Sequence, residues 1–209
     1  MSFPNLIISF AISFGLLVIA MTVHEFAHGY TAYKLGDPTA RLSGRLTLNP
    51  LAHIDLFWTF ILPAVLFLST GGRFVFGAAK PVPINYFALK NPKKDIIWIG
   101  LSGPLANLIL AFIVAQILKF VPTSGIVTYL LFHLLSINVV LAIFNLIPIP
   151  PLDGSRVLMG ILPDDLAQQY INLERYGFII LFIFIWLGFF ERILWPLVSL
   201  VIKMMGLGA

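Results

Sequence analysis

Four long apolar stretches constrain this chain more strongly than any other feature of its sequence. They cover residues 4–33, 95–120, 125–149 and 171–190. Each is long enough to cross the hydrocarbon core of a bilayer, which is about 30 Å thick and takes roughly 20 helical residues. Charged residues make up only 11% of the 209-residue chain, against about 25% in soluble domains. The sequence therefore predicts an all-α polytopic membrane protein.

The first stretch begins at Phe3 with no lysine or arginine before it. A secretory signal peptide carries a basic segment ahead of its apolar part and small residues at its cleavage site, and neither is evident here. We therefore expect residues 1–33 to form a retained spanning helix. With no internal repeat, we predict a single membrane-embedded domain over residues 1–209, with a core at about 4–160 and one or two C-terminal membrane helices at about 171–205.

The basic residues predict how the chain sits in the membrane. Eight of them fall between the first two stretches: Lys34, Arg41, Arg45, Arg73, Lys80, Lys90, Lys93 and Lys94. By the positive-inside rule this region is cytoplasmic and the N-terminus lies outside. The first and third spans then end on the same side, and the loop 153–170 is also cytoplasmic. The basic residues form no concentrated stripe, so we expect no nucleic-acid partner.

The apolar run 56–70 is too short to span the bilayer comfortably as a helix. If it crossed once, the lysines near residue 94 would lie outside and Asp153 would be separated from His28 by the whole bilayer. The run is therefore expected to dip in and return, with extended chain at 73–77 and 80–85, as a re-entrant β-hairpin-like segment. Irregular backbone at membrane depth is tolerated only where it lines a protein cavity, so this segment itself indicates a site. The piece 193–205 is compatible with a span, a surface helix or a helix packed across the bundle.

The first span contains His24, Glu25 and His28 in an HExxH pattern. Residues i and i+4 of a helix share a face, so both imidazoles can reach one metal ion, and the glutamate beside them can accept a proton from a metal-activated water. A chance pattern of polar residues packed in a helix bundle is the alternative. An ionisable residue at membrane depth costs at least ~2.5 kcal/mol on insertion scales, which favours the metal interpretation. The chain has no cysteine, so any site must use histidine and carboxylate ligands.

A catalytic zinc usually takes three protein ligands and keeps one position open. The third stretch ends in the sequence Asn-Leu-Ile-Pro-Ile-Pro-Pro-Leu-Asp-Gly, residues 145–154. Asp153 would be unpaired near the lipid interior unless it bound a cation. A proline-rich helix exit with a solvated aspartate remains open as the alternative, because Asp-Gly is a common turn.

Three motifs in this order resemble the site-two protease family of intramembrane zinc metalloproteases: HExxH, Gly-Pro-Leu-Ala-Asn at 103–107, and the Asn-to-Gly run at 145–154. The resemblance covers roughly residues 15–160, and segments 44–55 and 79–85 are similar to small bacterial and archaeal members. It implies one zinc per chain, bound by His24, His28 and Asp153, with Glu25 activating the water. It also implies that Asn145 holds the substrate peptide or its oxyanion.

The same resemblance implies peptide-bond hydrolysis within or near transmembrane segments of membrane proteins or signal peptides. We expect an integral protein of a prokaryotic plasma membrane, and the charge pattern predicts that its active site opens toward the cytoplasm. An unwound substrate is expected to pair with the extended chain near 73–85, as an added strand. A membrane zinc transporter and a non-catalytic scaffold are the alternatives. A di-iron oxidase would need more histidines than the four present.

Three polar residues lie outside the predicted ligand set. His53 is interpreted either as a near-site residue, such as a fourth ligand or a proton shuttle, or as a loop histidine bonded to backbone. His133 is expected to be packed and hydrogen-bonded within its span. Asn107, together with Gly103, is expected to allow close helix packing and to cap the start of its span.

Overall fold

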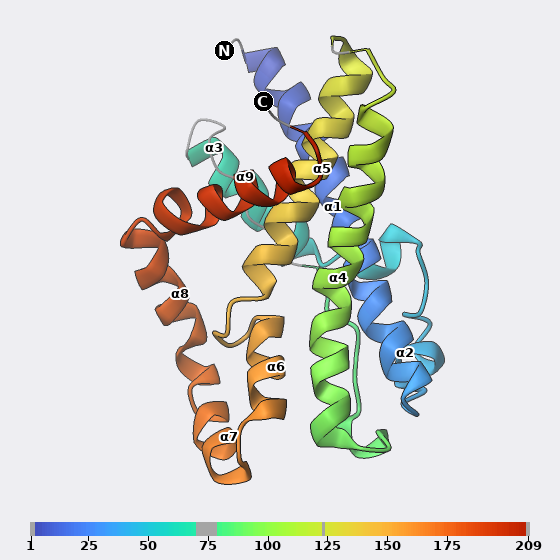
Figure 1. Cartoon of the computed structure of the whole chain (residues 1–209), viewed down its shortest axis with the longest axis vertical. Coiled ribbons are helices and arrows are strands. Elements are labelled where there is room, and N and C mark those ends of the chain that lie inside the picture. Colours follow the sequence, from blue (N-terminus) through green and yellow to red (C-terminus); the bar gives the residue numbers. More distant parts are fainter. Residues whose placement is uncertain (1–2, 70–78, 123, 208–209) are drawn as a thin grey trace.

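The computed structural model describes residues 3–69, 79–122 and 124–207, and this part of the chain is mostly helical. Three of its helices are long and apolar enough to cross a membrane. They are α1 (Phe3–Lys34), α4 (Pro92–Leu118) and α5 (Ile126–Asn145), and they coincide with the first three apolar stretches. Helix α4 is central, since it packs against α1, α5 and the short helix α6 (Asp153–Ile161) (Figure 1).

Local sequence explains where the long helices begin and end. Helix α4 starts at Pro92, where the missing N–H costs nothing, and its Asp95 accepts a hydrogen bond of 2.8 Å from the N–H of Asn91. Helix α5 stops at Asn145, before the predicted end at residue 149. Pro148 and the following prolines lack the N–H groups that would continue the helical hydrogen bonds.

The predicted fourth span, 171–190, is not confirmed as one spanning helix. It contains the end of α7 (Asp164–Ile171), a 3₁₀ turn and α8 (Gly177–Trp186). Helix α8 has 10 residues, or about 15 Å of rise, which is half of a bilayer core. The chain turns at Gly188, which has a φ of +79°, a conformation that glycine adopts without steric cost.

The last segment packs across the bundle. A π-helical turn (Phe190–Leu194) leads into α9 (Trp195–Met204), which lies steeply across the long helices (Figure 1). Its Val198, together with Leu194, joins the core formed by Val139 of α5 and Ala111 of α4. Of the three arrangements open for residues 193–205, the structure has the packed one.

The segment after α1 forms four short elements, the first two of which pack against α1. It comprises α2 (Thr39–Leu42), a 3₁₀ turn (Pro50–His53), a π-helical turn (Leu56–Ile61) and α3 (Leu62–Ser69). The N–H of Lys80 donates a 2.9 Å hydrogen bond to the carbonyl of His53, so the returning segment, residues 79–88, begins beside the 3₁₀ turn. The described residues contain no strand, and 79–85 has no regular secondary structure. The other arm of the predicted hairpin, with its turn, lies outside the described residues, so strand pairing stays a prediction.

Asp37 connects the end of α1 to the returning segment. Its side chain is fully buried. One carboxylate oxygen accepts hydrogen bonds from the N–H and hydroxyl of Thr39, and the other accepts a 2.7 Å bond from the N–H of Asn85. The Asn85 side chain in turn accepts from Phe87 N–H and starts the 3₁₀ turn Tyr86–Ala88. This carboxylate therefore links the end of α1 to Asn85 and to the 3₁₀ turn that follows it.

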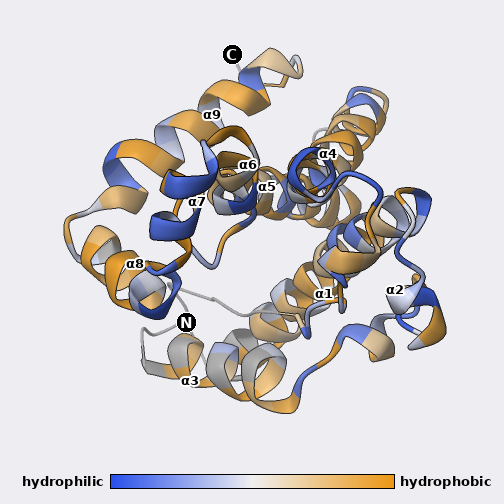
Figure 2. Cartoon of the chain, turned by 90° about the horizontal axis from the view of Figure 1, so that it is seen from below, coloured by the Kyte–Doolittle hydropathy of each residue, from blue (hydrophilic) through white to orange (hydrophobic). Residues whose placement is uncertain are grey.

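The helix ends are grouped as the charge pattern predicts. The end of α1, the start of α4 and helices α6 and α7 lie at the lower end of the molecule in Figure 1. Viewed from that end, hydrophilic residues concentrate on α7 and the start of α4, whereas α1, α8 and α9 are largely hydrophobic (Figure 2). That this end faces the cytoplasm stays a prediction.

Replacement of Asp37 by alanine is expected to destabilise the protein by about 3 kcal/mol, because buried donors of Thr39 and Asn85 lose a charged acceptor. Chemical unfolding in detergent would measure the loss, and proteolysis should cut faster near 79–88. Asp164→Ala is the matched control, because the exposed Asp164–Lys93 pair contributes little. Unchanged stability in Asp37→Ala would contradict this role.

Candidate metal centre

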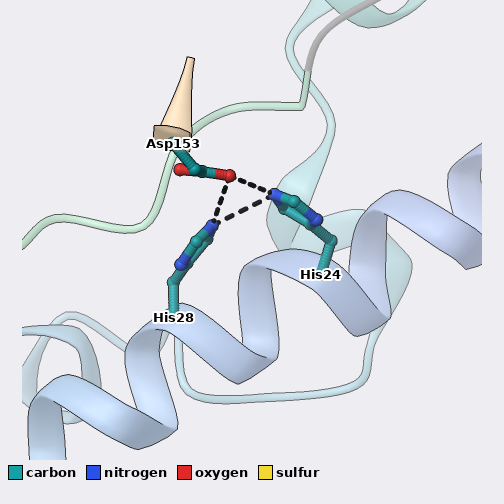
Figure 3. Close-up of side chains that lie close together, drawn as sticks. All are labelled: His24, His28 and Asp153. Carbon is teal, nitrogen blue, oxygen red and sulfur yellow. Dashed lines mark hydrogen bonds and ion pairs between the residues drawn. The ribbon is translucent and has the colours of Figure 1, made fainter. Parts of the chain in front are cut away.

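The two histidines of the HExxH pattern and Asp153 meet in the structure. His24 and His28 lie one turn apart on α1, and Asp153 is the first residue of α6. Nε2 of His24 lies 3.0 Å from Nε2 of His28 and 3.0 Å from Oδ2 of Asp153, and the third side of this triangle measures 3.2 Å (Figure 3). All three side chains are buried. In the described part of the chain they are the only such group of metal-ligating side chains.

The triangle of donor atoms fits a tetrahedral zinc ion. Zinc bonds of about 2.0–2.2 Å place neighbouring ligand atoms of a tetrahedron roughly 3.3–3.6 Å apart, and the observed separations of 3.0–3.2 Å are slightly shorter. Three electron-pair donors this close repel one another unless positive charge lies between them. Two imidazoles and one carboxylate are also a donor set typical of catalytic zinc sites, which keep a fourth position open.

The proline-rich turn after α5 brings Asp153 to α1. A Cβ on Gly154 would lie 2.2 Å from the carbonyl oxygen of Leu146, so only glycine allows the turn to close this tightly. The second carboxylate oxygen of Asp153 lies 3.6 Å from the guanidinium of Arg156. Burial alone would raise the pKa of Asp153, but His28 and His24 outweigh it and hold that pKa well below the usual range of a carboxyl. A carboxylate binds a metal in its ionised form.

Helix α4 orients both imidazole rings through contacts with their Nδ1 atoms. Nδ1 of His28 lies 2.7 Å from the carbonyl oxygen of Ile99, and Nδ1 of His24 lies 2.6 Å from Oδ1 of Asn107. Between these positions Gly103 lets the backbone of α4 touch the rings. A Cβ there would lie 2.5 Å from Nε2 of His28 and 2.7 Å from Nε2 of His24. The helix supplies acceptors for both Nδ1 atoms and leaves both Nε2 atoms facing Asp153.

The expectation for Asn107 was wrong in part. It does not cap the start of its span, because α4 begins at Pro92. Instead it lies in the middle of α4, and its side chain is fully buried against His24. The available signal was an amide four residues after Gly103 in an apolar span, where a polar side chain needs a polar partner.

Glu25 and Asn145 line a cavity next to the three ligand candidates. The cavity has a volume of about 120 Å³, and its walls also include Pro81, Val82 and Ile84 of the returning segment. The Val82 N–H donates a 2.8 Å hydrogen bond to Oε2 of Glu25. Asn145 lies at the end of α5 and donates a 3.0 Å bond from Nδ2 to the carbonyl of Leu141. The structure thus brings together all five residues predicted for the site.

The two remaining histidines lie outside the triangle. His53 is buried, and its Nε2 lies 2.8 Å from the carbonyl oxygen of Thr47. It does not line the cavity, which favours the loop interpretation over a fourth ligand. Nε2 of His133 lies 3.0 Å from the hydroxyl of Ser13, and its ring stacks on Tyr129, so it is packed and hydrogen-bonded as predicted.

Comparison with known families adds independent information. A family model described as Peptidase family M50 matches residues 9–125 and 120–187. The chain belongs to this family. Because M50 is the site-two protease family of zinc metalloproteases, the resemblance drawn from the three motifs is confirmed. Together with the three apolar helices, membership identifies the chain as a membrane protein.

Several proteins named as zinc metalloproteases are similar to this chain over most of its length. A Bacillus subtilis protein named "Putative zinc metalloprotease YwhC" is 36% identical over 192 residues, which cover 88% of this chain and 84% of the relative. "Putative zinc metalloprotease Rip2" of Mycolicibacterium smegmatis is 29% identical, covering 85% of this chain and 70% of its own length. "Zinc metalloprotease MJ0392" of Methanocaldococcus jannaschii is 28% identical over a region that covers 78% of this chain and 38% of the relative. No solved structure gives a significant match.

Gly103→Ala is expected to abolish metal binding, because the added methyl group would occupy the space of both Nε2 atoms. Metal analysis of the purified protein would measure the loss. Gly15→Ala is a matched control on α1, where a Cβ meets nothing within 4 Å. A Gly103→Ala protein with full metal content would show that the rings tolerate a wider separation from α4.

Proposed function

We propose that this M50 protein hydrolyses peptide bonds within or near transmembrane segments, with one zinc ion held by His24, His28 and Asp153. The observation that carries the proposal is the convergence of three ligand atoms within 3.0–3.2 Å, beside a cavity lined by Glu25. A bound zinc would polarise the scissile carbonyl and lower the pKa of a water molecule. All other roles fall to side chains and backbone of this chain.

Glu25 is the proposed general base. It follows His24 directly on α1 and reaches the same cavity. It would take a proton from the attacking water and pass it to the amine that leaves when the peptide bond breaks. The hydrogen bond from Val82 N–H to Oε2 holds the carboxylate at the cavity wall.

Asn145 is the proposed contact for the substrate peptide or its oxyanion. A side-chain amide has two N–H donors, and Nδ2 of Asn145 uses one of them on the carbonyl of Leu141. The second can donate to a substrate carbonyl oxygen inside the cavity. Such a donor is most useful where negative charge develops on that oxygen.

A transmembrane substrate must unwind before hydrolysis, because a helix ties up its own amide groups. The returning segment at 79–85 offers non-helical backbone at the cavity. Pro81 and Pro83 have no N–H, and the N–H of Val82 between them is bonded to Glu25. Residues 81–83 therefore have no N–H left for an incoming extended peptide. Such a peptide would have to donate its own N–H groups to carbonyl oxygens that Arg45 does not occupy.

The remaining parts of the proposal concern location and substrates. The basic residues between Lys34 and Lys94 support an N-terminus outside and a site opening toward the cytoplasm of a prokaryotic cell. Proposed substrates are single-span membrane proteins or signal-peptide remnants in the same bilayer. A zinc transporter is not favoured, because its ligands would follow a conduction path, whereas these ligands gather at one point beside a glutamate.

Glu25→Gln is expected to keep its zinc and to lose cleavage by at least about 100-fold, because glutamine cannot accept the proton. The measurement is cleavage of a panel of labelled single-span helices in detergent, with zinc content determined on the same preparation. A transporter or a scaffold would keep its function in this variant. Undiminished cleavage would rule out Glu25 as the base.

Zinc removal is expected to stop cleavage reversibly. Dialysis against a chelator should abolish cleavage, and one equivalent of zinc per chain should restore it. Asp153→Ala should fail to regain activity, because a two-histidine site lacks the third ligand of a catalytic zinc. Restoration that needs two or more equivalents would contradict a single-zinc centre.

A further inference from the structure

Two buried asparagines connect the metal centre to the neighbouring spans. Asn107 on α4 and Asn138 on α5 are both 0% exposed, and neither belongs to the proposed ligand set. Nδ2 of Asn107 donates to Oδ1 of Asn138 over 2.7 Å and to the carbonyl of Ala20 on α1 over 3.0 Å. Its Oδ1 lies 2.6 Å from Nδ1 of His24. A chain of hydrogen bonds therefore runs from α5 through α4 to the first predicted ligand on α1.

The direction of every bond in this chain is decided by backbone carbonyls, which only accept. Asn138 must point its Nδ2 at the carbonyl of Leu134, at 2.8 Å, so its Oδ1 faces Asn107. Asn107 must likewise point its Nδ2 at the carbonyl of Ala20. Reversing the Asn107 amide would set oxygen against oxygen at both Ala20 and Asn138. Neither asparagine can therefore flip, and Oδ1 of Asn107 faces His24.

This arrangement leaves His24 one tautomer for metal binding. An amide oxygen accepts a hydrogen bond and cannot donate one, so Nδ1 of His24 must carry the proton. Its Nε2 then presents an electron pair toward His28 and Asp153. The equivalent partner of His28 is the backbone carbonyl of Ile99, at 2.7 Å, which no side-chain substitution removes. Ser102 Oγ also lies 3.3 Å from Nδ1 of His28, but the shorter contact of His28 is with backbone. The contact of His24 Nδ1 is with a side chain.

We propose that Asn107 and Asn138 are positioning residues that fix the His24 tautomer and ring orientation, and so set the zinc affinity of the site. The proposal rests on the proposed zinc function. Removing a partner that orients a ligating histidine typically lowers metal affinity by about 10–100-fold. Asn107 acts directly on His24, and Asn138 acts through Asn107.

Two substitutions at Asn107 separate positioning from packing. Asn107→Asp keeps an oxygen that accepts from His24 Nδ1–H but sets its second oxygen against the carbonyl of Ala20 and Oδ1 of Asn138, whereas Asn107→Leu suits an apolar span and accepts nothing. Zinc affinity is measured by competition with a chelator in detergent. We expect Asn107→Leu to lose about 10–100-fold in affinity and Asn107→Asp to remain within a few-fold of wild type. A purely structural role predicts the opposite order, because a buried charge disturbs packing more than leucine does.

Asn138→Leu, alone and combined with Asn107→Leu, tests the outer step. Asn138→Leu removes the acceptor for one Asn107 N–H and is expected to lower zinc affinity less than Asn107→Leu does. The double leucine variant should lose no more affinity than Asn107→Leu alone, because both residues act along one chain of bonds. ¹⁵N spectra of histidine-labelled, zinc-loaded protein should show protonated Nδ1 for His24 in the wild type. In Asn107→Leu the spectra should show a mixture of His24 tautomers or shifted ¹⁵N resonances of the His24 ring.

His133→Leu is the matched control. It removes another polar link between α1 and α5, the 3.0 Å contact of His133 with Ser13, away from the ligand triangle. Its zinc affinity should equal that of wild type. Wild-type affinity in Asn107→Leu, or a larger loss in Asn107→Asp than in Asn107→Leu, would overturn the positioning role and leave the zinc site standing. A wild-type protein that binds no zinc would instead overturn the proposed function, and the positioning role with it.

Discussion

The structure depends on holding three electron-pair donors within 3.0–3.2 Å of one another inside an apolar helical bundle. Such a cluster is costly where water is excluded, unless a cation and oriented hydrogen bonds compensate it. The surrounding elements meet this requirement. Helix α4 provides the acceptors behind both imidazoles, the turn after α5 delivers the carboxylate, and the guanidinium of Arg156 lies beside its second oxygen.

Helix α4 has a larger part in the site than its motif suggests. Three residues along one helix carry out three different tasks: Ile99 accepts from His28, Gly103 clears space for both rings, and Asn107 accepts from His24. Their spacing of four residues keeps them on one face of the helix. The same helix packs on α1, α5 and α6, so it links metal geometry to the packing of the whole bundle.

The segment from Lys80 to Asn85 connects the fold to the proposed chemistry. Arg45 donates to the carbonyl of Lys80 over 2.6 Å, and the carboxylate of Asp37 holds Asn85. Between these anchors Val82 contacts Glu25 through its backbone. Non-helical backbone is unfavourable in lipid unless protein groups satisfy its hydrogen bonds, and the bonds at Lys80, Val82 and Asn85 do so here. This is the physical basis for considering the segment as the surface that meets an unwound peptide.

The sequence by itself determined the membrane class, the first three spans, and the HExxH and Asp-Gly motifs, because these are properties of local hydropathy and residue spacing. The distribution of basic residues also indicated that Asp153 and His28 lie toward the same side of the membrane. The sequence did not reveal the role of Asn107, the acceptor at Ile99, or the bond between Val82 and Glu25. It also did not show the break of the C-terminal segment into α8 and α9. Those features depend on which helix faces meet and how closely their backbones approach, and contacts between residues distant in the chain are decided only when the tertiary structure forms.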